Sequence, residues 1–174
     1  MSVKIYVEGG GVGELSLKRC QDGFRRFFER LLPGKEHVRV RPCGGRADAW
    51  RDFKIANDLA KPGEYVILLV DSEGPVGANI SAWDYLWGRK EDKWEKPKEA
   101  EDDQAHLMVQ CMEAWFMADR EAAVKHLGKN VKVSDLPAPV NNDIECLSKD
   151  RIIDALNKAA RKARKLRGGP EAGI

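Results

Sequence analysis

Short apolar runs that end abruptly are the clearest pattern along this chain. Residues 4–7 and 65–70 form such runs, which end at Glu8 with glycines and at Asp71-Ser72-Glu73, and residues 105–110 form a further run that passes directly into a predicted helix. This pattern is typical of strands buried in a parallel sheet. Residues 37–41 alternate between polar and apolar side chains, which predicts a further strand.

Helical spacing connects these predicted strands. Leu17, Cys20, Phe24, Phe27 and Leu31 are three or four positions apart, so they form one apolar stripe of a helix. The apolar pattern also predicts helices over residues 46–60, 80–87 and 112–119, and a last helix from about residue 149. The region from 134 to 146 is rich in Pro, Asn and Asp and predicts a loop.

The alternation of strands and helices predicts the fold class. Its β-α-β-α-β order favours a single α/β domain over residues 1–174, with a mostly parallel sheet of about four strands and helices on both faces. Residues 74–103 contain many charges and three tryptophans, and we interpret them as an insertion or lid over the strand ends.

Composition narrows the class of protein. The 174 residues are 43% hydrophobic and 33% charged, as in ordinary globular domains. No apolar stretch approaches the ~20 residues of a membrane span, and no signal-peptide pattern begins the chain, so we expect a cytoplasmic protein that makes no membrane contact. The four cysteines are far apart in sequence, which predicts reduced thiols and not a disulfide framework.

Carboxylates follow two of the predicted strands. Glu8 ends the first apolar run, and Asp71 and Glu73 come directly after the run at 65–70. If the two strands are neighbours, these three side chains converge at one edge of the sheet, where open α/β sheets bind ligands. Their mutual repulsion favours a cation, and hard oxygen ligands suit Mg²⁺ or Mn²⁺. Gln110 ends the run at 105–110, Glu113 follows it, and both are candidates for positions next to these ligands.

Helix capping is the alternative explanation for these acids. A carboxylate near a helix N-terminus is favourable, and Asp71 with Ser72 could cap the next segment. Capping explains each acid alone more easily than it explains all three together.

A glycine cluster, Gly9-Gly10-Gly11-Val12-Gly13, follows Glu8 and invites a nucleotide-binding interpretation. The P-loop pattern is absent, and the sixth position of the dinucleotide fingerprint is Glu14 instead of glycine. An NADP-binding domain, with Arg41 at the 2′-phosphate, is therefore a minor alternative. We expect the glycines to keep the strand end accessible to a metal and a phosphate backbone.

Positive charge gathers near the C-terminal end. The net charge is +2, yet residues 149–167 hold eight basic residues against two acidic ones. A basic helix of this kind is compatible with nucleic-acid binding or with a solvated helix face. We expect Arg161, Arg164 and Lys165 to contact phosphates, and Arg46 to be a further phosphate contact.

Glu after a first strand, with Asp-x-Glu after a third, resembles the Toprim fold of topoisomerases, DnaG-type primases and overcoming-lysogenization-defect nucleases. The resemblance implies that Glu8 acts as a general acid/base or metal ligand, and that Asp71 and Glu73 bind Mg²⁺. Glu73 stands where Toprim enzymes usually have Asp, so its longer side chain alters the spacing of the ligands.

A closer resemblance is to the bacterial domain-of-unknown-function family 4276 (DUF4276), over about residues 3 to 160. It rests on segments at 7–11, 23–27, 43–49, 68–73 and 102–119, the last of which is the most specific. The family usually continues past the basic helix, so we expect the C-terminal end here to be truncated or divergent.

The expected function is a Mg²⁺- or Mn²⁺-dependent nucleic-acid phosphodiesterase of the Toprim type, acting in bacterial defence. Its catalytic and metal-binding residues would be Glu8, Asp71 and Glu73. The alternative is a non-catalytic or partner-activated component of a complex with an AAA-type ATPase, because related Toprim domains are often fused to or paired with such ATPases. The choice of DNA or RNA, the number of metal ions and the oligomeric state are left open by the sequence.

Overall fold

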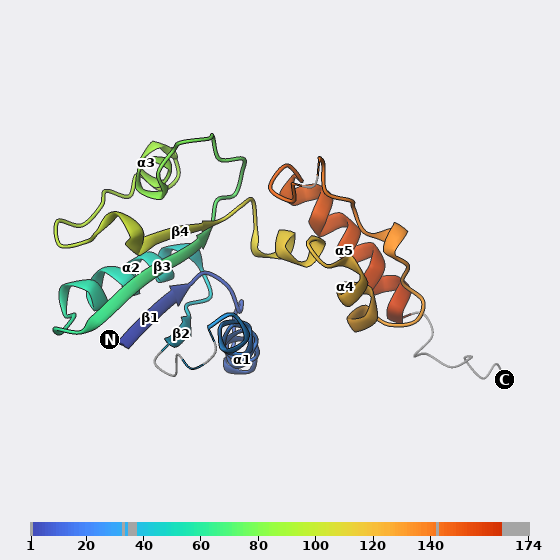
Figure 1. The fold of residues 1–174 in the computed structure, drawn as a ribbon, viewed down its shortest axis with the longest axis horizontal. Coiled ribbons are helices and arrows are strands. Elements are labelled where there is room, and N and C mark those ends of the chain that lie inside the picture. The colour runs from blue at the N-terminus through green and yellow to red at the C-terminus, as the bar shows by residue number, and fades with distance from the viewer. Residues whose placement is uncertain (1, 33, 35–37, 142, 165–174) are drawn as a thin grey trace. The chain divides into compact units, whose positions relative to one another are not determined.

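A computed structural model describes residues 2–32, 34, 38–141 and 143–164 (Figure 1). The chain divides into two compact units. The first contains the described residues up to Val70 together with Gly77–Leu107, and the second contains Asp71–Val76 and the described residues from Met108 onward. No helix in these described ranges has the length and apolarity that a membrane span needs.

The central sheet has four strands in the order β2-β1-β3-β4. They are β1 (Ser2–Val7), β2 (Val38–Pro42), β3 (Glu64–Asp71) and β4 (Ala105–Met108). β1 pairs in parallel with both β2 and β3, and Val7 is in register with Leu69. The predicted α/β class with a parallel sheet of four strands is confirmed.

Helices alternate with the strands of the first unit. They are α1 (Glu14–Leu31), α2 (Arg46–Asp58) and α3 (Ala82–Gly88), and a 3₁₀ helix (Asp102–Gln104) precedes β4. The even-numbered residues of β3, Val66, Leu68 and Val70, pack with α2 and α3 in one hydrophobic core, because side chains alternate across a strand. Phe53 of α2 is completely buried in this core.

The apolar stripe of α1 is only partly covered. Phe24 is buried, and the Gln21 amide donates a hydrogen bond of 2.9 Å to the carbonyl of Val40 in β2. Phe27 and Leu31 from the same stripe are exposed. The spacing therefore predicted the helix correctly, but it did not predict that Phe27 and Leu31 are exposed.

Residues 74–103 belong to the fold instead of standing apart from it. Trp83, Leu86 and Trp94 from this segment are buried in the same core as Phe53. The indole N–H of Trp83 donates to the carbonyl of Glu101 at 3.1 Å. The lid function of this segment stays a prediction.

The second unit is helical, with a core of its own. It contains a 3₁₀ helix (Met112–Met117), α4 (Arg120–Leu127), a second 3₁₀ helix (Val133–Asp135) and α5 (Lys149–Arg164). Its core residues are Cys111, Ala114, Met117, Val131, Leu136, Leu147, Ile152 and Ala159. The helix predicted over 112–119 is a 3₁₀ helix that ends at Met117. Asp119 instead caps α4, because its carboxylate accepts a hydrogen bond of 2.9 Å from the N–H of Ala122.

Candidate metal centre

The first two candidate carboxylates stand at the ends of neighbouring strands. Glu8 directly follows β1, and its N–H donates to the carbonyl of Leu69 in β3 at 2.9 Å. Asp71 is the last residue of β3, two positions beyond Leu69. Strand pairing and chain continuity therefore bring the backbones of Glu8 and Asp71 to the same edge of the sheet, as the sequence predicted.

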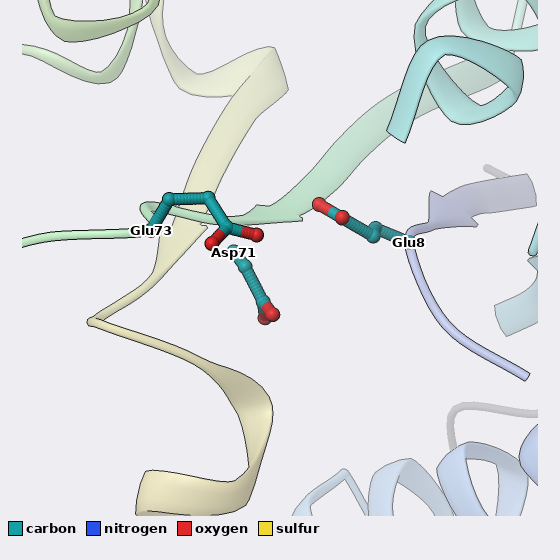
Figure 2. Close-up of side chains that lie close together, drawn as sticks. All are labelled: Glu8, Asp71 and Glu73. Atoms are coloured by element: carbon teal, nitrogen blue, oxygen red, sulfur yellow. The ribbon is translucent and has the colours of Figure 1, made fainter. Parts of the chain in front are cut away.

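Glu73 follows two residues later. Figure 2 shows the three side chains, and each of them is half-buried. The convergence of the three carboxylates and their roles as metal ligands and catalytic groups stay predictions.

The glycine cluster after β1 allows two loops to approach closely. Gly9 exchanges two backbone hydrogen bonds with Gly44, of 3.0 and 2.9 Å, and Gly9, Gly10 and Gly11 all have positive φ. A Cβ atom on Gly44 would lie 2.9 Å from the carbonyl oxygen of Gly11. Glycine is therefore needed here for backbone conformation and close loop contact.

Glu8 has a cationic partner in the first unit. The Arg46 guanidinium donates to Glu8 Oε2 at 3.0 Å and to both oxygens of Asp92, at 2.9 and 2.7 Å. It also lies over the ring of Trp94, 4.9 Å from the centroid. Arg46 is thereby fixed between two carboxylates beside Glu8, and its predicted phosphate contact stays a prediction.

Asp92 anchors this arrangement. Its side chain is only 4% exposed and also accepts a hydrogen bond of 2.6 Å from Arg89. Burial alone would raise the pKa of Asp92, but hydrogen bonds and charges from Arg46 and Arg89 outweigh it and hold the pKa below its ordinary value. Asp92 is therefore an ionised, buried group that orients Arg46.

Backbone contacts hold the segment Asp71-Ser72-Glu73 in the second unit. The N–H groups of Ser72 and Glu73 donate to the carbonyls of Met108 and Gln110, at 3.0 and 2.9 Å. Ser72 is completely buried, and Glu73 has φ 66, which is uncommon for a residue other than glycine. Strained backbone of this kind is frequent at functional sites and persists only where the surrounding contacts determine it.

Lys149 provides the cation for these two acids. Its Nζ lies 2.8 and 2.7 Å from the two oxygens of Glu73 and 3.6 Å from Asp71 Oδ2. The other oxygen of Asp71 accepts a hydrogen bond of 2.8 Å from the N–H of Met112. Burial opposes the charge of Lys149, but Glu73 and Asp71 outweigh it, so the pKa of Lys149 is raised above its ordinary value.

The two residues predicted next to the ligands have different surroundings. The Gln110 side chain is nearly buried and donates to the carbonyl of Glu145 at 3.2 Å, while its backbone carbonyl accepts from Glu73. Glu113 lies close enough to Cys111 to affect its pKa. Burial raises the pKa of Cys111 to about 11, and the negative charge of Glu113 is the second cause. Gln110 therefore supports the acid segment through its backbone, and Cys111 is a protonated thiol at neutral pH.

The exposed basic residues of α5 include Arg151, Lys158, Arg161 and Arg164. Lys165 lies outside the described residues. Arg151 and Lys158, together with Arg120 of α4, line a hollow of about 530 Å³. Ile152 and Ala159 of the same helix are buried in the core of the second unit.

The chemistry of these donors fits a divalent ion. Ionised carboxylates are hard oxygen ligands of the kind that Mg²⁺ and Mn²⁺ prefer. Asp71 and Glu73 lie two positions apart in the second unit, and both side chains are half-buried.

Sequence reasoning missed Lys149 and Asp92 as members of this constellation. Lys149 was counted with the basic helix, although a cation at a helix N-terminus opposes the helix dipole, and that conflict was a usable signal. Asp92 lies among many charged residues, and nothing in the sequence distinguishes it from them.

Comparison with known proteins gave one match. The family model described as "Domain of unknown function (DUF4276)" matches residues 7–172. The searches of curated proteins and of solved structures found no match.

Proposed function

The chain belongs to the DUF4276 family, and we propose that it is a Mg²⁺- or Mn²⁺-dependent phosphodiesterase that acts on nucleic acid. The observation that carries this proposal is the position of Glu8 and Asp71 at the ends of the neighbouring parallel strands β1 and β3, with Glu73 two residues later. The carboxyl ends of strands in open α/β sheets are where ligands bind, and oxygen donors of this kind favour hard divalent ions.

Glu8, Asp71 and Glu73 would hold the ion. When bound, a divalent ion stabilises charge on phosphoryl oxygens and lowers the pKa of a coordinated water. Asp71 and Glu73 are suited to the ligand role because backbone hydrogen bonds fix their segment. Glu8 would complete the ligand set or accept a proton from the attacking water, and Arg46 orients it.

We extend the proposal to a Toprim-like relationship and to a cytoplasmic location. The relationship is supported by the pattern of Glu after β1 and Asp-x-Glu after β3, on strands that are direct neighbours. Glu73 has a longer side chain than the Asp that Toprim enzymes usually have at this position. Its backbone has a positive φ, and this conformation would compensate for the extra length.

Nucleic acid would bind through the basic face of α5. Arg161 and Arg164 are exposed, as are Arg151 and Lys158, which line the hollow at Arg120. Lys and Arg contacts to phosphates supply affinity without reading sequence, so we propose little sequence preference.

A cleavage assay tests the proposal. The purified protein is incubated with single-stranded DNA, duplex DNA and RNA, in Mg²⁺, Mn²⁺ or EDTA. We expect metal-dependent cleavage of at least one substrate, and a loss of at least about 100-fold in Glu8→Gln and in Asp71→Asn, because both variants remove a ligand charge.

Asp48→Asn is the matched control, since Asp48 is an exposed α2 residue that pairs with Arg51. It should cleave like the wild type. Cleavage that survives both Glu8→Gln and Asp71→Asn would reject the assignment of the site. Cleavage that appears only after addition of an ATPase would favour the alternative of a partner-activated component.

A further inference from the structure

Lys149 is the first residue of α5, and its side chain reaches the acid segment of its own unit. The ammonium nitrogen is bonded to both oxygens of Glu73, at 2.7 and 2.8 Å, and lies 3.6 Å from Asp71. It thus occupies the place between the two oxygens of Glu73 that a divalent ion would need for bidentate binding.

We infer that Lys149 and a divalent cation are alternative occupants of the Asp71–Glu73 pair. Lys149 neutralises the carboxylates when no ion is bound, and it leaves Glu73 when an ion arrives. This inference deepens the proposed function, because it rests on metal binding by these two residues and describes how that binding is regulated.

The backbone of the acid segment is the fixed part of this exchange. The Asp71 carboxylate accepts from the N–H of Met112, and the backbone N–H of Glu73 donates to the carbonyl of Gln110. Contacts other than those with Lys149 therefore hold the Asp71 carboxylate and the backbone of Glu73.

The Lys149 side chain is the part that moves in this exchange. Its side chain is 31% exposed and consists of a flexible four-carbon chain that ends in a compact charge. The helix dipole does not favour a cation at the first residue of a helix, so the acids are what retain the ammonium there. An arriving divalent ion would both repel the ammonium and replace its attraction to Glu73.

Lys149→Met removes the competing ammonium group while keeping an unbranched side chain that is one heavy atom shorter. Mn²⁺ binding is measured by isothermal titration calorimetry on the full chain. We expect Lys149→Met to bind Mn²⁺ at least ~10-fold more tightly than the wild type, because one nearby positive charge is gone. Its melting temperature in EDTA should fall, and Mn²⁺ should raise that temperature more in the variant than in the wild type.

Lys162→Met is the control, since Lys162 also lies on α5 and pairs with a carboxylate, Asp135, at 2.7 Å. It should leave Mn²⁺ affinity unchanged. If Lys149→Met does not fold in EDTA or in Mn²⁺, the inference is tested by measuring the Mn²⁺ affinity of Lys149→Arg instead. A guanidinium binds a carboxylate through two parallel hydrogen bonds, so this variant should bind Mn²⁺ more weakly than the wild type.

Two results separate the failure of this inference from that of the proposed function. Equal or weaker Mn²⁺ binding by Lys149→Met, with clear binding by the wild type, would overturn the inference alone. Equal Mn²⁺ affinity of Lys149→Arg and the wild type would do the same. If neither the wild type nor Lys149→Met binds Mn²⁺ at millimolar concentration, the proposed metal site itself is wrong.

Discussion

Asp92→Asn tests whether the buried ion pair behind Glu8 stabilises the fold. The substitution keeps the size of the side chain but removes the charge that faces Arg46 and Arg89. Two guanidinium groups would then be left near one another without their shared counter-ion. Because their side chains are only 15% and 18% exposed, water compensates for the loss incompletely.

The size of the effect follows from this burial. Removing one partner from a buried ion pair typically costs about 3–5 kcal/mol. Both arginines retain some contact with water, and Arg46 keeps its bond to Glu8, so we expect a loss near the lower limit, about 3 kcal/mol. Asp48→Asn breaks a pair between exposed side chains on α2 and should change the free energy of unfolding negligibly.

Urea unfolding followed by tryptophan fluorescence is a suitable assay. Trp50, Trp83, Trp87 and Trp94 lie in the first unit with Asp92, so the signal reports mainly on that unit. The free energy of unfolding is measured for the wild type, Asp92→Asn and Asp48→Asn at several pH values.

The pH dependence carries a definite sign. The folded pKa of Asp92 is lower than its ordinary value of 3.8, so its charge stabilises the fold fully above that value. The difference between the wild type and Asp92→Asn should be constant near neutral pH. It should shrink as the pH falls below 3.8 through the folded pKa. Equal stability of Asp92→Asn and Asp48→Asn at neutral pH would refute the reasoning.

Two further substitutions test the core and the basic helix. Phe53→Ala removes a completely buried ring between α2 and the sheet and should lower the free energy of unfolding by about 3–5 kcal/mol, measured by the same urea assay; a loss below about 1 kcal/mol would contradict the core assignment. The double variant Arg161→Gln/Arg164→Gln should weaken binding to a labelled oligonucleotide and reduce the slope of log affinity against log salt by about two units. A salt slope equal to that of the wild type would show that these exposed arginines do not contact phosphate.

The fold was largely predictable from the sequence because its strands are short, apolar and sharply terminated. In the β3 run from Val66 to Val70 every residue except the half-buried Ile67 is buried, so every position is apolar and the pattern is unambiguous. The region after β4 was harder to predict. The apolar residues after β4 fit a helix that continues to residue 119. Whether Asp119 ends that helix or caps the next one depends on which backbone N–H donates a hydrogen bond to its carboxylate, and this is the N–H of Ala122.

The site was predictable in part for the same reason. Glu8 and Asp71 follow directly from strand ends, and neighbouring parallel strands bring their ends together. The cations that neutralise them were not predictable, because Arg46 and Lys149 are respectively 38 and 76 positions away from their partners Glu8 and Glu73. Ion pairs at such separations depend on tertiary packing, which leaves no periodic signal in the sequence.

The most direct test of the central claim is Mn²⁺ binding by the unmodified chain, measured by calorimetry beside Glu8→Gln, Asp71→Asn and Glu73→Gln. If the three carboxylates hold a divalent ion, the wild type should bind Mn²⁺ and each of the three variants should bind it at least about 10-fold more weakly. Asp48→Asn should bind like the wild type. Wild-type affinity in all three variants, or no binding by the wild type, would contradict the claim.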